Sequence, residues 1–420
     1  MSQRQPLQRD AALIALLERD FGRGRASGLA GRTSTARPGR NTGSNAPSSH
    51  LEQPHGQSPV LDHLCEQALL APVREFLGRP SKGFRGRLVR HAWALAGGEP
   101  GQLPAELPLA VEVLHAGSLI VDDIQDQSET RRGRPALHHL YGTPLALNTG
   151  NWLYFWSLQL MTRGLPDRVA TTVQRRAVST MLYCHQGQAL DLSTRVCDLD
   201  RADVAETVAM ATGLKTGALM EFAAWLGAVA CQAPLEQCEA LARAGYQLGV
   251  GLQMLDDLGG LVAPSRRQKG LEDVRLARLT WPWAWLAEYT ETGTFSRLQK
   301  RTRELAESTH GDTAQARRPE KQLRDGRAGT NGSSHPADDA GQLADEMARI
   351  VADLGRDRVH RHLSTAFAEL RRSMEPLAAG RDNGKRGRQA GQKAGYRVES
   401  RSIALAELER EINRLEVSYG

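Results

Sequence analysis

Apolar residues recur at helical spacing through most of this 420-residue chain. Positions three and four apart lie on one face of a helix, so the spacing predicts helices rather than strands. The longest predicted helices of the core cover residues 59–77, 107–126, 145–160, 285–308 and 342–377. The pattern therefore predicts an all-α protein built as a single-domain helical bundle, with a core domain over residues 58–378.

Three segments, 1–57, 309–342 and 379–400, are almost devoid of apolar runs. Within the first, residues 7–21 predict a short amphipathic helix that could pack on the body or on a partner. Residues 22–57 are rich in Gly, Ser, Arg and Pro and cannot bury enough apolar surface to offset chain entropy. They are predicted to form a disordered basic arm.

The second and third segments lie in the C-terminal half of the chain. Residues 309–342 are predicted to be a disordered insertion in the core domain. The last part, 379–420, is predicted to consist of a basic linker over 381–396 and an amphipathic helix over 403–417. That helix is expected to dock on the body or pair with another protomer.

Three aspartates end the most apolar predicted helix. Asp122 and Asp126 are four residues apart and share one face, about one turn from each other. Two like charges there repel unless a cation lies between them, and Mg2+ suits oxygen ligands that it can share with phosphate and water. Arg131 and Arg132 follow, with forked donors suited to phosphate. The alternative interpretation is a solvated acidic helix end.

A second acidic pair, Asp256 and Asp257, follows another apolar helix. Two carboxylate clusters that project inward from separate helices are a common way for a helical bundle to hold a metal cluster. The pair therefore favours a magnesium and diphosphate site over a solvated helix end.

In wording and spacing, residues 114–142 resemble the first aspartate-rich signature of the head-to-tail (trans) isoprenyl diphosphate synthases, most closely the geranylgeranyl diphosphate synthases of the eukaryotic type. Five further stretches agree with the family in order: 80–85, 185–191, 215–217, 253–257, and 269–273 together with 278–282. The resemblance implies the isoprenoid synthase fold, with a central cavity and two aspartate-rich helices facing each other. It also implies a prenyltransferase that joins isopentenyl diphosphate to an allylic diphosphate.

The resemblance assigns roles to individual residues. Two to three Mg2+ ions are expected at Asp122, Asp126 and Asp256. The allylic diphosphate is expected at Arg131, Lys215 and Lys269, with Arg278 as a further substrate-binding residue. The family places Lys215, Thr216 and Gln253 around the allylic carbon, so they are the expected catalytic residues. Isopentenyl diphosphate is expected at Lys82, Arg85, His115 and Arg132. Supporting roles are expected for Asp123, Gln188, Asp257 and Asp273.

Gly117 and Ser118 stand where short-product members of the family tend to carry bulky aromatics. Small side chains there imply an open tunnel and a product longer than farnesyl diphosphate, which favours geranylgeranyl diphosphate (C20). The chain departs from the family pattern at two places: Leu-Gly-Gly follows Asp257 instead of a sequence with a third aspartate, and Arg278 replaces the usual lysine.

The formal net charge of +6 is concentrated in the low-complexity arms. No basic patch interleaved with aromatics is present in the sequence, so nucleic acid is not an expected partner, and at most loose membrane association is expected. The five cysteines form no CxxC pair, which is typical of a reduced, cytoplasmic chain. The sequence shows no run long enough to span a bilayer and no signal-peptide core. The resemblance implies a homodimer.

Rival interpretations stay open at this point. A terpene cyclase of the same fold would need the metal site but not Lys82, Arg85, His115 and Arg132. The intact first aspartate motif disfavours a catalytically silent partner subunit, while the Arg278 exchange, the Leu-Gly-Gly ending and the long low-complexity arms leave that interpretation open. A nucleic-acid-binding protein is supported by charge alone.

Overall fold

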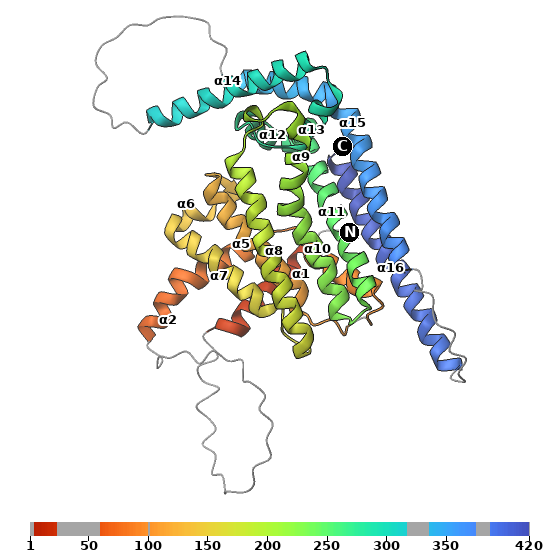
Figure 1. Cartoon of the computed structure of the whole chain (residues 1–420). Helices are drawn as coiled ribbons and strands as arrows, with labels where there is room; N and C mark the ends of the chain where they lie inside the picture. Colours follow the sequence, from red (N-terminus) through yellow and green to blue (C-terminus); the bar gives the residue numbers. More distant parts are fainter. Residues whose placement is uncertain (1–3, 23–58, 100, 317–335, 375–386, 420) are drawn as a thin grey trace, which may run out of the picture. The chain divides into compact units, whose positions relative to one another are not determined.

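The computed structural model describes residues 4–22, 59–99, 101–316, 336–374 and 387–419. In these ranges the chain is almost entirely helical, with one two-stranded sheet (Figure 1). The predicted all-α class is confirmed. No helix in the described ranges combines the length and apolar character needed to cross a bilayer.

The chain divides into two compact units. The first contains Met1–Phe84 and Leu109–Met161, and the second contains Arg85–Pro108 and Thr162–Gly420. The boundaries between the units fall inside the predicted core domain over 58–378. Helix α1 lies in the same unit as the helices that begin that domain. Each unit has its own buried apolar side chains.

Helices and one hairpin build the first unit. Their bounds are α1 Arg4–Phe21, α2 Pro59–Cys65, α3 Ala71–Leu77, α5 Glu106–Gln125, β1 Thr130–Arg131, β2 Arg134–Pro135, α6 Leu137–Tyr141 and α7 Thr143–Leu160. The predicted helix over 59–77 is present, and it contains a π-helical turn at Glu66–Leu70. Gly142, with φ of +79°, separates α6 from α7 in a conformation that glycine adopts at little cost.

The N-terminal amphipathic helix packs inside the first unit. Leu13 and Leu17 of α1 are almost completely buried. Phe21 makes an edge contact with the ring of Trp152 in α7, with centroids 4.9 Å apart. The indole N–H of Trp156 donates to the Asp20 carboxylate at 3.0 Å. Of the two sequence expectations for this helix, packing on the body is therefore the one observed.

The second unit is a bundle around α11, as Figure 1 shows in green and blue. Its helices are α4 Phe84–Leu95, α8 Asp167–Ser193, α9 Arg201–Thr212, α10 Ala218–Ala230, α11 Leu235–Val262, α12 Arg267–Arg275, α13 Trp281–Tyr289, α14 Thr292–Ala316, α15 Pro336–Met374 and α16 Gly387–Tyr419. Helix α11 is buried over most of its length because α10 and α15 pack along it. Gly245 and Gly249 let α10 approach closely, since a Cβ there would meet Ala224 or Met220 within 3 Å.

The C-terminal helix docks on its own unit. Leu408 and Ile412 of α16 are fully buried. Glu411 accepts hydrogen bonds from Arg87 of α4, at 2.9 Å from Nε. Glu409 is paired with Arg371 of α15. The helix thus covers α4 and α15 through an apolar face flanked by ion pairs.

Several predicted boundaries are wrong. The predicted insertion over 309–342 overlaps α14, which continues to Ala316, and α15, which begins at Pro336. The predicted linker over 381–396 overlaps α16, which begins at Gly387. The remainders, 317–335 and 381–386, lie outside the described residues, as does almost all of 22–57. The apolar pattern marks the buried face of a helix, whereas backbone helicity extends beyond that face.

Candidate active site

Helix α5 ends at the first aspartate cluster. The backbone N–H of Asp126 donates to the carbonyl of Asp122 at 2.8 Å, so the helical turn continues past Gln125. Both aspartates are half-buried. The structure therefore places these two carboxylates one turn apart on the same side, as their spacing predicts.

Asp123, between them, has a different environment. Its carboxylate is completely buried and accepts a hydrogen bond from the Arg131 Nε at 2.7 Å. Burial raises the pKa of Asp123, while the hydrogen bond and the charge of Arg131 oppose that shift. The other carboxylate oxygen, Oδ2, accepts no hydrogen bond from the described residues. Asp123 therefore anchors Arg131 at the end of α5.

Arg131 lies on a short antiparallel hairpin. Thr130 pairs with Pro135, and Arg131 pairs with Arg134, so Arg132 and Gly133 form the turn. Both turn residues have positive φ, 56° for Arg132 and 75° for Gly133, as two-residue hairpin turns require. This backbone is unfavourable for arginine but ordinary for glycine. The Arg132 guanidinium lies over the Phe76 ring, 5.4 Å from its centroid.

Arg79 holds this hairpin, and the sequence did not single it out. It is completely buried just after α3. Its guanidinium donates to the carbonyls of Arg131 at 3.0 Å and of Pro135 at 2.8 Å. It also pairs with Glu75 at 2.8 Å. An Arg four residues after a Glu is a visible helical pair, but the contact with the hairpin has no local sequence signal.

His115 and the two chain-length positions lie on α5. His115 is half-buried, with its Nδ1 3.5 Å from the Ser118 hydroxyl, which donates to the His115 carbonyl at 2.9 Å. Gly117 is buried against α7, where a Cβ would lie 2.8 Å from the Gly150 carbonyl. The small size of Gly117 therefore has a packing cause, and its role in chain length stays a prediction, as does that of Ser118.

The two basic residues expected to bind isopentenyl diphosphate lie around the start of α4. Lys82 is exposed and precedes Gly83, which has φ of +60°. Arg85 is in the first helical turn and is half-buried. The division between the two units falls after Phe84, so these residues belong to different units.

In the second unit, Asp256 near the end of α11 is bound by two cations. Arg266 and Lys269 both donate to its carboxylate. Desolvation raises the pKa of Asp256, but these two charges outweigh it and lower the pKa overall. Helix α12 brings Lys269 here because Gly270 lies against the backbone of Gly260, where a Cβ would clash at 1.9 Å. Arg266 was not predicted.

A network of charges extends from Lys215 to Asp273. The Lys215 ammonium donates to Asp191 of α8 at 2.7 Å. Arg278 lies 3.7 Å from Asp191 and 3.8 Å from Asp273. Burial raises the pKa of Asp273 to about 6. Asp191 therefore already balances the charge of Lys215. The expected contact between Lys215 and the allylic diphosphate stays a prediction.

Gly187 explains how α8 reaches that network. A Cβ at Gly187 would lie 2.5 Å from the backbone nitrogen of Lys215, which is in the π-helical turn Gly213–Gly217. The close approach brings Asp191, one turn further along α8, within reach of Lys215. Gln188 lies on the same helix and is half-buried.

Thr216, Gln253 and Asp257 form a second chain of contacts. The Thr216 hydroxyl donates to the Gln253 amide oxygen at 3.2 Å, and the Gln253 NH2 donates to Asp257 at 2.7 Å. Asp257 also accepts the backbone N–H of Trp281 at 3.0 Å. Burial raises the pKa of Asp257 to about 7. These bonds fix the orientation of the Gln253 amide.

The donor chemistry fits a magnesium ion shared with a ligand. Among the described residues, no group of three or more His, Cys, Asp or Glu side chains is arranged to hold a metal by itself. Mg2+ needs fewer protein ligands, since it commonly takes one or two carboxylates together with phosphate oxygens and water. Asp122 and Asp126, one turn apart, supply such a pair.

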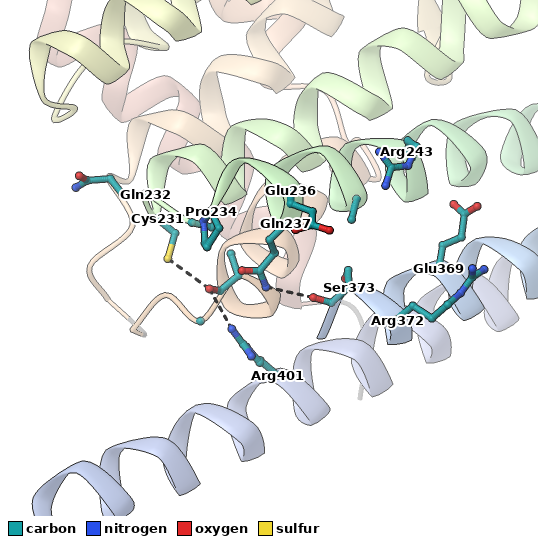
Figure 2. A pocket seen from close by; sticks show the side chains of 14 residues that line it. Cys231, Gln232, Pro234, Glu236, Gln237, Arg243, Glu369, Arg372, Ser373 and Arg401 are labelled. Carbon is teal, nitrogen blue, oxygen red and sulfur yellow. Dashed lines mark hydrogen bonds between the residues drawn. The ribbon is translucent and has the colours of Figure 1, made fainter. Parts of the chain in front are cut away.

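A separate cavity of 560 Å³ lies in the second unit, where the carboxyl end of α4 meets α11, α15 and α16 (Figure 2). Gln237 donates to the Ser373 carbonyl at 3.3 Å, and Arg401 donates to the Ala96 carbonyl at 3.3 Å. The described lining includes none of the predicted site residues. The cavity is therefore distinct from the aspartate clusters.

Comparisons with known proteins add to this geometry. The family model described as Polyprenyl synthetase matches residues 66–316. The chain is 30% identical over 255 residues to geranylgeranyl pyrophosphate synthase 2 of Zymoseptoria tritici, covering 58% of this chain and 73% of that protein. It is 34% identical over 161 residues to geranylgeranyl diphosphate synthase of Sulfolobus acidocaldarius, covering 37% of this chain and 48% of that protein.

A solved structure shares the fold. The crystal structure of geranylgeranyl pyrophosphate synthetase from Pyrococcus horikoshii aligns with a TM-score of 0.57 and 20% identity, covering 80% of this chain and 89% of that one.

Proposed function

Because the chain belongs to the polyprenyl synthetase family, we propose that it condenses isopentenyl diphosphate with an allylic diphosphate to form linear geranylgeranyl diphosphate. The observation that carries the proposal is the end of α5, where Asp122 and Asp126 lie one turn apart and the Arg131–Arg132 hairpin is anchored beside them through Asp123. Hard oxygen ligands beside phosphate-binding arginines suit a metal-bound diphosphate.

Asp122, Asp126 and Asp256 would hold Mg2+, which when bound neutralises the diphosphate and makes it a better leaving group. Arg131, Lys215 and Lys269 share the remaining negative charge. In the second unit each of these lysines is already paired with an aspartate. The diphosphate would therefore compete with Asp191 and Asp256 for their ammonium groups. Arg278, next to Asp191, would keep that carboxylate paired.

The residues around the allylic carbon act through fixed dipoles. The Gln253 amide is held by Asp257, so its oxygen stays directed at the Thr216 hydroxyl. Preorganised oxygens of this kind stabilise positive charge as the C–O bond ionises, and they need no reorganisation at that moment. Lys82, Arg85, His115 and Arg132 would hold the isopentenyl diphosphate whose double bond attacks the cation. The diphosphate leaving group takes the proton that is lost.

The C20 product rests on the relatives named geranylgeranyl diphosphate synthase and on the small residue at Ser118. We expect Ser118→Phe to shorten the product, because an aromatic ring next to Asp122 on α5 would narrow the prenyl tunnel. Gly117→Ala is a poor probe of length, since its Cβ would meet the backbone of α7. We also propose that the protein is a homodimer and that it is cytoplasmic.

Product analysis tests the function. The purified protein would be given Mg2+, isopentenyl diphosphate and, in turn, dimethylallyl, geranyl and farnesyl diphosphates. Asp122→Ala should abolish product, whereas Asp353→Ala, at a fully exposed aspartate of α15, should not. A linear C20 diphosphate supports the proposal. A hydrocarbon formed without isopentenyl diphosphate would identify a cyclase, and no turnover with any primer would identify a silent subunit.

A further inference from the structure

Arg79 contacts both strands of the hairpin that carries Arg131 and Arg132. Its Nη1 donates to the Arg131 carbonyl on β1 at 3.0 Å, and its Nη2 donates to the Pro135 carbonyl on β2 at 2.8 Å. These two carbonyls lie on either side of the turn. One buried guanidinium therefore ties the two strands to the end of α3.

The hairpin depends on such an anchor. Each strand has two residues, and an isolated hairpin of this size has little stability in water. The turn also places Arg132 at φ of 56°, which an arginine adopts at a cost. Outside contacts must therefore decide where the two arginine side chains lie.

Arginine is suited to this position by its planar fork of five donors. In addition to the two carbonyls, the guanidinium meets the Glu75 carboxylate, 3.0 Å from Nε and 2.8 Å from Nη2. It lies 5.2 Å from the centroid of the Phe76 ring, which Arg132 also contacts. Lysine carries all its donors on one nitrogen, so it cannot reach the three acceptors that Nε, Nη1 and Nη2 of Arg79 reach.

We propose that Arg79 is a positioning residue for diphosphate binding: it fixes the hairpin so that Arg131 and Arg132 are presented to substrate. The inference rests on the proposed function for its biological meaning. Arg79 itself is completely buried and would not touch substrate.

The test compares Arg79→Lys with the matched variant Arg134→Lys. Arg134 lies on the same hairpin and also reaches Glu75, at 3.4 Å, but its side chain is 58% exposed. Two measurements are made on the full-length protein. Calorimetry gives the affinity for inorganic diphosphate with Mg2+, and hydrogen exchange read by mass spectrometry reports the backbone of residues 128–137.

We expect Arg79→Lys to weaken diphosphate binding about tenfold, as loss of one or two hydrogen bonds would. Exchange should rise at 128–137 while other helices keep their protection. In turnover, the KM for each diphosphate substrate should rise with kcat little changed, because ground state and transition state lose the same contact. Arg134→Lys should change none of these.

Unchanged affinity and exchange in Arg79→Lys would overturn the proposal. So would faster exchange throughout the first unit, because Arg79 would then be a general core residue. Glu75→Gln gives a second test if Arg79→Lys does not fold, since it keeps the carbonyl bonds and removes the charge that orients the guanidinium. A smaller loss of affinity, again with exchange confined to 128–137, is expected there, and an unchanged affinity would count against the proposal.

The two proposals can fail separately. If the wild-type protein binds Mg2+ and diphosphate but forms no prenyl product, the proposed function is wrong, and the Arg79 comparison still decides the positioning role. Absence of diphosphate binding by the wild-type protein would overturn both.

Discussion

The two Asp-Asp pairs, Asp122–Asp123 and Asp256–Asp257, are arranged alike but differ in which aspartate binds the neighbouring cations. In each pair the second aspartate is buried and ties its helix to a later segment: Asp123 binds Arg131 on the hairpin, and Asp257 accepts the backbone N–H of Trp281 at the start of α13. In the first pair the cation, Arg131, binds this buried second aspartate, Asp123. In the second, the cations Arg266 and Lys269 bind the predicted metal ligand, Asp256.

This difference indicates two ways of handling the same ligand. In the first cluster the cation, Arg131, is bound to Asp123, and we propose that Asp122 and Asp126 bind the metal ion. The second offers two cations whose carboxylate partner must be shared when a diphosphate arrives. We therefore expect the same Asp-Asp dipeptide to hold a metal ion in the first unit and to exchange ionic partners in the second.

The largest expected effect is on turnover. Asp122→Asn should lower kcat/KM about a thousandfold, because it removes a charged ligand of the Mg2+ that would neutralise the leaving diphosphate. Its free energy of unfolding should stay within about 0.5 kcal/mol of wild type, or rise as repulsion with Asp126 is relieved. Steady-state kinetics and urea unfolding measure both, with Asp353→Asn as control. If Asp122→Asn kept full activity, the first aspartate cluster would not be part of the metal site.

A smaller effect, on the free energy of unfolding, should differ between the two buried aspartates, Asp123 and Asp257. Asp123→Asn leaves Arg131 without its buried partner and should cost about 3 kcal/mol. Asp257→Asn should cost less than about 1 kcal/mol, because neutral donors hold Asp257 and an amide can still accept from Trp281. Chemical unfolding of the two variants would compare them directly. Equal losses would mean that the anchors do not differ.

The third effect, on pH dependence, is spread over about two pH units. Burial raises the pKa of Asp273 to about 6, above its unfolded value. The folded chain then binds more protons than the unfolded chain between about pH 4 and 6, so stability falls as the pH rises through this range. Asp273→Asn should remove this decline, which a pKa shift of about two units limits to about 3 kcal/mol. Unfolding curves from pH 4 to 8 test this, and an unchanged profile would contradict it.

Family, fold class and the spacing of Asp122 and Asp126 could be read from the sequence, because they depend on local periodicity and short motifs. The roles assigned to individual site residues stay predictions. The structure adds Arg79 and Arg266, and it shows that Asp191, which ends the 185–191 stretch, pairs with Lys215. Arg79 is 52 residues from its contact at Arg131, and Lys215 is 24 residues from Asp191. Pairs of this kind form through tertiary packing and leave no local pattern.

Gly117 and α15 show two further limits of the sequence. A glycine at a close helix contact and a glycine that opens a tunnel look the same in a sequence, and Gly117 is in contact with α7. The start of α15 carried a usable signal, Pro336 followed by acidic residues, which is typical of a first helical turn. The apolar pattern overlooked it because that turn has few apolar residues.

The docking of α1 and α16 has a consequence for where this protein can be cut. The family match covers residues 66–316 and leaves out both helices. A fragment trimmed to that span would expose the Trp152 and Trp156 rings that α1 covers and would leave Arg87 without Glu411. We therefore expect a fragment that keeps both end helices to be more stable and more soluble than one trimmed to residues 66–316.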